Sequence, residues 1–484
     1  MGLLVESEKR HWKQVISDLE EKVTAEKRRS ERLQLQLTTN AETGLPNSVT
    51  LHKELESVLE ATPEPKAVVF MALNDSFGVL KRSFSTKIPE WILFQTSLRI
   101  QKVIENHGRV YHTQEDEFLI LVEQFESPDK VAELAKQLVE KVKKSHVMAG
   151  LTISLGVNLG VAFYPDHGRK KSTLLRNADI ALSEAVKNKV DFQLFTPELK
   201  DRMVENVELQ NGMLLALEGQ ANPEEKPQFE LYLHPQVEVR HWGTPQAQGR
   251  IVGAEALLRW KHPTRGFIPP SQFIPVAEET GLIIPLGQWI LHSAITYVLE
   301  LQKQGFPHIA ISVNLSSSQF NYEDVSALIK DVARRRGVAP QSLKLEITES
   351  GLMENVQETI YKATSLRQAG FKILVDDFGT GYSSLSYLKD LPVDVVKIDK
   401  SFVDGVPRSP SDQALTRAII ALARDLNLGI IVEGTEHREQ IDWLYEQGCT
   451  VFQGYYFSKP LQYVDFVKLA KNFPQTFKQI VSGK

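Results

Sequence analysis

Apolar residues near the start of the chain recur with the period of a helix. Between residues 3 and 37 there is no glycine or proline, and apolar side chains stand at Trp12, Ile16, Leu19, Val23, Leu33 and Leu37. Glu26 and Ser30 occupy the two positions that interrupt the series. The pattern predicts a long amphipathic helix over residues 1–39 with an imperfect heptad seam. We expect this helix to pair with a second copy as a parallel coiled coil in a homodimer; the alternative is a single helix packed on its own domain.

The next stretch alternates short apolar runs with amphipathic ones. Residues 40–47 end the first helix with the turn Thr43-Gly44-Leu45-Pro46-Asn47. Three buried strands are predicted, at 67–73, at 117–123, and at 151–155 continued by 160–163. Three helices are predicted, at 90–105, 128–145 and 172–187. This order of elements predicts an α/β domain with a mixed sheet over residues 40–198.

A more regular pattern follows a polar segment. Residues 222–227 are polar and contain two prolines, which predicts a linker over 199–227. Eight short apolar runs come next, at 229–233, 250–257, 309–314, 343–347, 372–375, 395–398, 429–432 and 451–452. Helical stretches separate most of them. Repeated βα units of this number predict a TIM-type (β/α)8 barrel over residues 228–484.

Composition and charge narrow the class of protein. The 484 residues are 42% hydrophobic and carry a net charge of −5, so we expect no nucleic-acid partner. The single cysteine, Cys449, forms no intramolecular disulfide, which favours a reducing compartment. No apolar run is long enough to span a membrane and no secretory leader opens the chain. We therefore expect a cytoplasmic location, with a membrane anchor upstream of this chain left open.

Polar side chains gather where the predicted barrel strands end. They are Asn314, Glu346, Glu349, Asp376, Asp377, Lys397, Asp399, Glu433 and Gln453. One acidic residue after a strand is often only the cap of the next helix. However, the strands of such a barrel end at one mouth, where several carboxylates repel one another. Divalent cations relieve that repulsion.

The residue types at these positions favour particular cations. All the candidate ligands are oxygen donors, which suits Mg²⁺ or Mn²⁺ better than Zn²⁺. Two such ions can hold a phosphodiester and activate a water molecule. Lys397 adds a positive charge for a phosphate or a water. The residues alone therefore predict metal-assisted phosphoester chemistry.

These motifs resemble those of a known family. Glu255-Ala256-Leu257-Leu258-Arg259-Trp260 resembles the signature of EAL-domain cyclic di-GMP phosphodiesterases, which are barrel proteins. Further similar segments lie at 273–278, 312–316, 346–349, 376–385, 397–399, 433–436 and 453–455. The similarity covers residues 228–470. It implies hydrolysis of cyclic di-GMP to linear pGpG with two Mg²⁺ or Mn²⁺ ions.

The resemblance also implies roles for individual residues. The metal ligands would be Glu255, Asn314, Glu346 and Asp376, with Asp377 and Asp399 as second-metal or shared ligands. The catalytic group would be Lys397, Glu433, Asp377 and Glu349, the last as the anchor of the loop at 377–384. The substrate contacts would be Leu257, Arg259, His234, Gln453 and Asp399. His234 is a departure, because the family usually has glutamine there, so substrate affinity is expected to differ.

The middle domain resembles a GGDEF, or diguanylate cyclase, domain. The similar segments are 43–47, 164–168 and 177–182. Its signature is degenerate, because Gln114-Glu115-Asp116-Glu117-Phe118 stands where two glycines should begin the motif. Asn74 also occupies a position in the segment where the family carries metal-binding carboxylates. We expect no cyclase activity and a regulatory or dimer-forming role.

A second reading of the whole chain stays open at this point. A degenerate middle domain and the change at His234 are also compatible with a cyclic di-GMP receptor or scaffold that acts through a regulatory protein partner. The complete set of expected metal ligands favours the enzyme.

Overall fold

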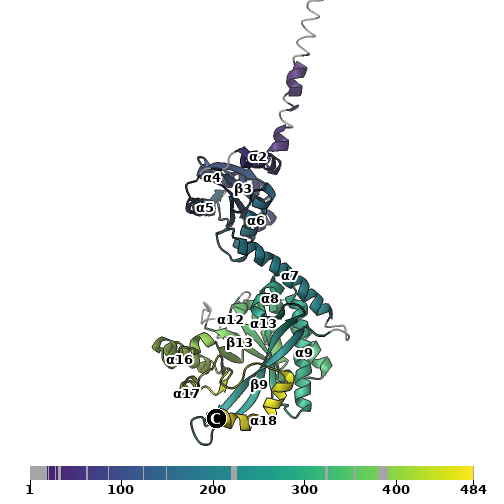
Figure 1. Cartoon of the computed structure of the whole chain (residues 1–484), viewed down its shortest axis with the longest axis vertical. Helices are drawn as coiled ribbons and strands as arrows, with labels where there is room; N and C mark the ends of the chain where they lie inside the picture. Colours follow the sequence, from purple (N-terminus) through teal and green to yellow (C-terminus); the bar gives the residue numbers. More distant parts are fainter. Residues whose placement is uncertain are drawn as a thin grey trace, which may run out of the picture. The chain divides into compact units, whose positions relative to one another are not determined.

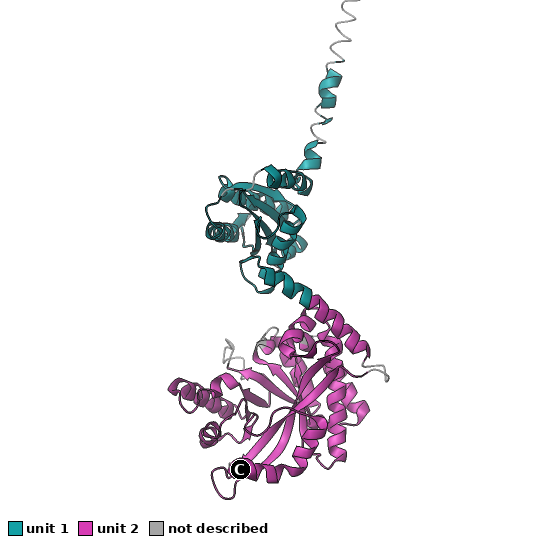
Figure 2. Cartoon of the chain, viewed as in Figure 1, with its two compact units in different colours: residues 1–205 teal, residues 206–484 magenta. Residues whose placement is uncertain are grey.

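The chain divides into two compact units. The computed structural model describes residues 19, 21–27, 29–30, 34–61, 64–84, 87–123, 125–148, 150–219, 226–321, 325–353, 356–379 and 391–482. Contacts between residues separate unit 1, residues 1–205, from unit 2, residues 206–484 (Figure 2). Among the described helices, none combines the length and apolar character needed to cross a membrane.

The predicted N-terminal helix is described only in part. Residues 21–27 and 34–38 are helical, and the remainder of the expected seam lies largely outside the described residues. Val23 and Leu37, two apolar residues of the seam, are 65% and 68% exposed. These two apolar side chains are therefore largely exposed to solvent in the single chain. The coiled coil stays a prediction.

Unit 1 is built on a five-stranded mixed sheet, as predicted. Its strand order is β2-β3-β1-β6-β7, with β1 antiparallel to β3 and β6, and β6 parallel to β7. The strands are β1 (Lys66–Leu73), β2 (Gly108–His112), β3 (Glu117–Val122), β6 (Val157–Tyr164) and β7 (Phe192–Leu194). The helices are α2 (Ser48–Ala61), α3 (Asp75–Ser83), α4 (Lys87–Ile104), α5 (Pro128–Lys143) and α6 (Lys171–Lys187).

Both faces of this sheet are buried, which explains its uninterrupted apolar runs. Val69 and Ile120 belong to a core with α4 and α5, whereas Val68 and Leu119 belong to a second core with α2 and α6. Because successive residues of a strand point to opposite faces, each apolar run supplies both cores.

One predicted strand of unit 1 was wrong. Residues 151–155 and 160–163 do not form one strand. Instead, β5 (Leu151–Ile153) pairs with β4 (His146–Met148) as a separate two-stranded sheet, and β6 lies between β1 and β7 in the main sheet. Gly156, just before β6, marks the break between them.

A helix occupies most of the segment predicted as a linker. Helix α7 (Pro197–Gly219) begins with a proline and runs across the division between the units. Leu199 lies in a core of unit 1. Leu209, Met213 and Ala216 recur at helical spacing and lie in the core of unit 2.

Unit 2 is the predicted eight-stranded barrel. Its strands are β8 (Phe229–Arg240), β9 (Gln248–His262), β11 (Ala310–Leu315), β12 (Leu343–Thr348), β13 (Lys372–Phe378), β14 (Val395–Ile398), β15 (Gly429–Val432) and β16 (Val451–Phe452). The strands from β9 to β16 are parallel, and pairing of β16 with β8 and of β8 with β9 closes the ring. The TIM-type architecture is therefore confirmed.

The barrel departs from eight repeated βα units at its first strand. Strand β8 is antiparallel to both β9 and β16, and residues 241–247 join β8 to β9 as a hairpin without a helix. The long pairing of β8 with β9 places His234 directly opposite Glu255. Both strands also run well beyond the apolar segments that predicted them.

Helices surround the barrel on its outside (Figure 1). They are α8 (Pro270–Glu279), α9 (Ile283–Lys303), α10 (Ser317–Asn321), α11 (Val325–Arg336), α12 (Glu349–Met353), α13 (Val356–Gln368), α15 (Lys400–Val403), α16 (Pro410–Asp425), α17 (Arg438–Glu446) and α18 (Tyr463–Ser482). Short elements complete the unit: β10 (Gly266–Ile268), β17 (Leu461–Gln462) and the 3-10 turn Pro340–Ser342. Helices α9, α13 and α16 pack on β11, β13 and β14.

Candidate active site

Adjacent barrel strands bring the predicted acidic residues together. Pairing of β9 with β11 aligns Glu255 with Ser312, and pairing of β11 with β12 aligns Asn314 with Glu346. Asp376 follows on β13, opposite Thr348. Carboxylate oxygens of Glu255, Glu346 and Asp376 lie within 4.8 Å of one another. It is the one such acidic group of three or more found among the described residues.

The ammonium of Lys397, on β14, lies at the centre of this cluster. Its Nζ atom is 2.6 Å from Glu346 Oε2 and 2.6 Å from Glu433 Oε1. It also lies 3.0 Å from Asp376 Oδ1 and 3.5 Å from Glu255 Oε2. The side chains of Lys397 and Glu346 are fully buried. One ammonium therefore faces four carboxylates in a region that water does not screen.

Burial and mutual repulsion shift the titration of this cluster. Burial, together with the charges of Glu255 and Asp376, raises the pKa of Glu346 to about 8, although Lys397 acts in the opposite direction. Burial likewise raises the pKa of Glu433 to about 8. Burial disfavours the ammonium of Lys397, but the surrounding carboxylates outweigh it and raise the lysine pKa well above its ordinary value. The centre thus holds more negative charge than its lysine neutralises.

The donor set fits divalent cations of the magnesium type. The Oε1 atom of Glu346 is buried and has no hydrogen-bond partner among the described residues. A buried carboxylate oxygen without a donor is costly unless a cation or water satisfies it. Oxygen donors of Glu255, Glu346 and Asp376 would form one face of such a site.

The two amide side chains predicted for the site both contact Glu255. Asn314 donates from Nδ2 to Glu255 Oε1 at 2.7 Å, and Gln453 donates from Nε2 to Glu255 Oε2 at 2.5 Å. Burial raises the pKa of Glu255, but Lys397 and these two donors outweigh it, so the pKa is lowered. Glu255 is therefore held ionised, as a metal ligand must be.

His234 enters the site from β8. Its Nδ1 atom lies 3.2 Å from Gln453 Nε2 and its Nε2 atom lies 3.1 Å from the carbonyl oxygen of Ser458. Burial lowers the pKa of His234, with Glu255 acting in the opposite direction. The imidazole is therefore neutral at neutral pH, and each of its ring nitrogens already contacts a protein group, Gln453 or Ser458.

The second pair of acidic residues lies at the edge of the cluster. Asp377 is exposed and has a positive φ of 54°, an unusual conformation for a non-glycine residue. Burial of its carboxyl group, followed by the charges of Asp376 and Asp399, raises its pKa. Asp399 caps helix α15 by accepting a hydrogen bond from the backbone N–H of Ser401 at 2.9 Å. For Asp399, the structure thus shows the helix-capping role that is the alternative to metal binding. Metal binding by Asp377 and Asp399 stays a prediction.

Glu349 holds the start of the loop that follows β13. Its Oε2 atom accepts a hydrogen bond from the backbone N–H of Gly379 at 2.7 Å. Gly379 has a φ of 99°, and a Cβ there would meet the Phe402 ring at 3.0 Å. The contact agrees with the anchoring role expected of Glu349, although the rest of the loop lies outside the described residues.

Leu257 and Arg259 lie on β9 beyond Glu255. Because side chains alternate along a strand, all three share one side of β9. Arg259 is half-buried, with its guanidinium 5.5 Å from the centre of the Tyr232 ring. The two residues therefore continue the site outward from the acidic cluster, where a substrate contact is expected.

A hollow of about 280 Å³ opens over the cluster. It is lined by His234, Glu255, Asp376, Lys397, Lys400, Glu433, Gly434, Glu436, Gln453, Gly454 and Tyr455. Lys400, Glu436 and Tyr455 were not predicted. Lys400 pairs with Glu436 at 2.6 Å. The sequence could have indicated these three residues, because they lie one to three positions after the predicted site residues Asp399, Glu433 and Gln453.

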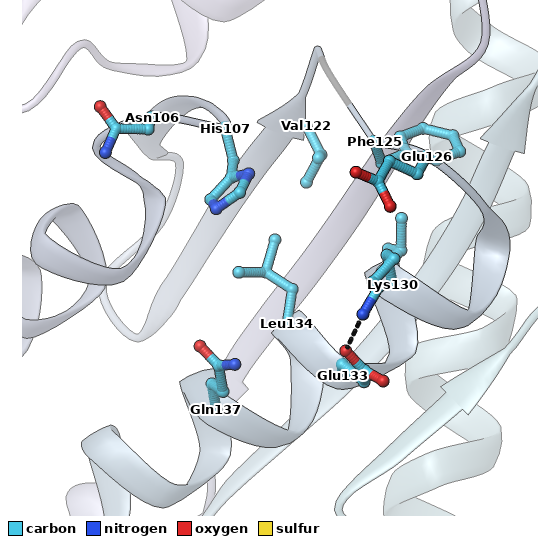
Figure 3. Close-up of a pocket in the computed structure, with 10 residues that line it drawn as sticks. Asn106, His107, Val122, Phe125, Glu126, Lys130, Glu133, Leu134 and Gln137 are labelled. Carbon is cyan, nitrogen blue, oxygen red and sulfur yellow. Dashed lines mark hydrogen bonds and ion pairs between the residues drawn. The ribbon is translucent and has the colours of Figure 1, made fainter.

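Unit 1 contains a larger hollow of different character. Its volume is about 610 Å³, and it lies among the α4–β2 turn, the end of β3 and helix α5. His107 and Leu134 border it, and Lys130 pairs with Glu133 at its rim (Figure 3). Its charged side chains are exposed. It therefore lacks the buried charge that marks the barrel site.

Two family models match the chain. The EAL domain model matches residues 219–460, and the model of the diguanylate cyclase, GGDEF domain, matches residues 38–191. The chain is an EAL-domain protein. A GGDEF domain precedes its EAL barrel, as the sequence motifs predicted.

Relatives share this arrangement over most of the chain. The cyclic di-GMP phosphodiesterase PdeR of Escherichia coli is 31% identical over 93% of this EAL protein and 66% of its own length. The bifunctional diguanylate cyclase/cyclic di-GMP phosphodiesterase MucR of Pseudomonas aeruginosa is 33% identical over 89% of this chain and 61% of its own length. This EAL protein thus spans about half to two thirds of the length of the curated relatives it matches.

A solved structure agrees with the fold. The EAL enzyme Bd1971, in a form with cAMP and cyclic di-GMP bound, has a TM-score of 0.52 and 26% sequence identity. The alignment covers 73% of this chain and 81% of that one.

Proposed function

We propose that the EAL barrel hydrolyses cyclic di-GMP to linear pGpG and needs Mg²⁺ or Mn²⁺ to do so. The observation that carries this proposal is the buried cluster of four carboxylates around Lys397, with Glu346 Oε1 lacking a partner among the described residues. The names of PdeR and of the Bd1971 complex support the substrate. Glu255, Asn314, Glu346 and Asp376 would hold the first ion, and Asp377 and Asp399 the second.

The residues around the hollow divide the chemistry between them. Divalent ions held by these ligands would polarise the phosphodiester and help to activate a water molecule. Lys397 stays positively charged, so it attracts the phosphate and orients the attacking water. Glu433 lines the hollow with a pKa near 8, which suits a group that exchanges a proton near neutral pH. Water adds to phosphorus, one P–O bond breaks, and a proton reaches the leaving 3′-oxygen.

Removal of one ligand tests the proposal. Purified full-length protein with cyclic di-GMP and Mn²⁺ should release pGpG, and chelation of the ion should stop the reaction. Glu255→Gln should lower turnover by at least ~100-fold, because the site loses a charged ligand. Glu238→Gln is the matched control, since Glu238 pairs with Arg250 away from the cluster. Wild-type protein that binds cyclic di-GMP with Mn²⁺ yet yields no product would refute the proposal.

The GGDEF domain is proposed to regulate the barrel without making cyclic di-GMP. Its turn carries Gln114 and Glu115 in place of two glycines, and Glu115 forms an ion pair with Lys81. MucR is named as bifunctional, so the distinction needs a measurement. Incubation of the Glu255→Gln variant, which should not degrade the product, with GTP and Mg²⁺ should yield no cyclic di-GMP. Formation of that product would overturn this part of the proposal.

A receptor without turnover is the second candidate. It is favoured by His234, which replaces the usual glutamine and is already bonded to Ser458. Tight binding of cyclic di-GMP together with negligible turnover, in the presence of Mn²⁺, would support a receptor that signals to a protein partner. His234→Gln should then raise turnover.

We also propose a homodimer formed through the N-terminal seam. Val23 and Leu37 are exposed, so Val23→Asp with Leu37→Asp should not harm the folded units. Light scattering should show a fall in mass from dimer to monomer. An unchanged dimer would place the contact elsewhere.

A further inference from the structure

Polar side chains continue from the acidic cluster through the interior of the barrel. Gln453 donates to Glu255 and, in turn, its Oε1 atom accepts a hydrogen bond from Nε2 of Gln236 at 3.2 Å. The Oε1 atom of Gln236 accepts from Nζ of Lys344 at 3.1 Å. The chain of contacts thus runs from Lys344 on β12 through Gln236 on β8 to Gln453 and Glu255.

Lys344 determines which group donates and which accepts in each hydrogen bond of this series. A lysine ammonium only donates, so the Gln236 oxygen must face Lys344 and the Gln236 nitrogen must face Gln453. The same reasoning turns the Gln453 nitrogen towards Glu255 and towards His234 Nδ1. An amide nitrogen donates, so His234 Nδ1 accepts and the ring proton lies on Nε2.

The far side of the imidazole agrees with this tautomer. The Nε2 atom of His234 lies 3.1 Å from the carbonyl oxygen of Ser458, which can only accept. A proton on Nε2 therefore satisfies both contacts of the ring. Gln236 is 0% exposed and Gln453 is 3% exposed, so bulk water does not offer either amide a competing partner.

Gly253 makes room for the chain of bonds. It lies opposite Gln236 in the β8–β9 pairing. A Cβ at Gly253 would lie 2.6 Å from Gln236 Oε1 and 3.1 Å from Lys344 Nζ. A methyl group there would disturb the Lys344–Gln236 contact and would also lie 3.1 Å from the carbonyl oxygen of Ala310.

We propose that Lys344 and Gln236 are positioning residues of the catalytic centre. Through the donor chain they fix the orientation of the Gln453 amide, the tautomer of His234 and the position of Glu255. The consequence for catalysis rests on the proposed function. The orientation of the Gln453 amide and the position of the His234 ring proton do not depend on that function. Buried outer partners of metal ligands typically change metal affinity about 10- to 100-fold when they are replaced.

An isosteric substitution separates positioning from packing. Gln236→Glu keeps the shape and still accepts from Lys344, but its carboxylate cannot donate to Gln453. The Gln453 amide should therefore rotate and present its oxygen to Glu255 and His234. The Gln453 oxygen then repels the Glu255 carboxylate, which weakens the ordered position of Glu255. The same oxygen accepts a hydrogen bond from His234, so the ring proton moves to Nδ1. Gln475→Glu, on the exposed surface of α18, is the control for the chemical change.

The test reads the tautomer in the metal-free full-length protein. Nitrogen-15 NMR of histidine-labelled protein distinguishes the two tautomers, and the His234 signals among the 12 histidines are assigned by their loss in His234→Gln. We expect the Nε2–H form in wild type and in Gln475→Glu, and the Nδ1–H form or a mixture in Gln236→Glu. Gly253→Ala and Lys344→Met should also produce a mixture. An unchanged Nε2–H form in all three variants would overturn the proposal.

Calorimetric titration with Mn²⁺ alone gives a second readout. Gln236→Glu should bind Mn²⁺ at least about tenfold more weakly than wild type, and Gln475→Glu should match wild type. Affinities within twofold of each other for Gln236→Glu and wild type would overturn the link to Glu255. Neither readout uses cyclic di-GMP. If Gln236→Glu changes the His234 tautomer but the wild-type protein shows no turnover, the proposed function is refuted and the proposed series of hydrogen bonds is still supported.

Discussion

The two units differ in how much charge their described residues bury. Unit 1 buries His112 and His146 in their neutral form, since burial is the main cause that lowers the pKa of each. Unit 2 buries Lys397 among carboxylates in charged form. A neutral buried imidazole needs only hydrogen bonds, whereas a buried cluster with excess negative charge needs further cations. The location of net buried charge therefore distinguishes the proposed reaction centre from a structural core in this chain.

The same contrast applies to the acidic signature of each unit. In unit 1, Glu115 pairs with Lys81, and the Glu115 side chain is 79% exposed. Water solvates such a pair, so no ion is required. In unit 2, Glu346 has no exposed atom, so its ionised form needs a neighbouring cation such as Lys397. Three predictions test this difference.

Loss of the central ammonium should have the largest effect. Lys397→Met leaves Glu255, Glu346, Asp376 and Glu433 buried without their shared counter-charge. Removal of one partner from a buried ionic group costs roughly 3–5 kcal/mol. Thermal unfolding in the presence of a chelator should show this loss. Added Mn²⁺ should restore more stability to the variant than to wild type.

The control for this substitution is Lys372→Met. Lys372 pairs with Asp394, and its side chain is 53% exposed. Its replacement should change the free energy of unfolding by less than about 1 kcal/mol, with or without Mn²⁺. Equal stability of Lys397→Met and wild type in chelator would contradict the account of the cluster.

The barrel was largely predictable because its strands are short apolar runs that each end in a polar residue. Asn314, Asp376 and Glu433 could be placed at one mouth on that basis alone. The β8–β9 hairpin was not foreseen, because both strands continue through polar residues such as Glu238 and Lys261. Pairing between those strands becomes visible only in three dimensions.

The features that the sequence did not reveal have a common physical reason. Apolar periodicity does not show which side chains meet, so the bonds that join Gln236 to Gln453 and Lys344 to Gln236 left no pattern in the sequence. Helix α7 was taken for part of a linker, since its polar surface conceals the apolar residues, such as Met213, that pack on the barrel. Asp399 shows that a helix cap and a candidate ligand can be the same residue.

A pH-dependent effect of intermediate size is expected in unit 1. Burial and the nearby Arg99 lower the pKa of His146 from about 6.5 to about 4. The unfolded chain therefore binds more protons than the folded chain between these values. The stability contributed by neutral His146 is complete above pH 6.5 and is lost as the pH falls towards 4. We expect a loss of roughly 1–2 kcal/mol, discounted because Arg99 is only half-buried.

Urea unfolding of His146→Gln measures this contribution. A glutamine can still accept a hydrogen bond from Arg99 but does not titrate, so the variant should lose less stability than wild type between pH 6.5 and 4. His52→Gln, on the exposed surface of α2, should keep the wild-type slope. Parallel slopes for His146→Gln and wild type would show that this histidine is not held neutral in the fold.

The smallest effect is expected at the acidic turn of unit 1. Glu115→Gln removes the exposed ion pair with Lys81, and such pairs contribute about 0–1 kcal/mol. The substitution should shift the free energy of unfolding by less than about 0.5 kcal/mol and leave Mn²⁺ binding by the full chain unchanged in calorimetry. Glu346→Gln, the same chemical change in the barrel, should weaken Mn²⁺ binding by at least about tenfold. If Glu115→Gln also weakened the binding of Mn²⁺, unit 1 would hold a second cation site and the contrast between the two units would fail.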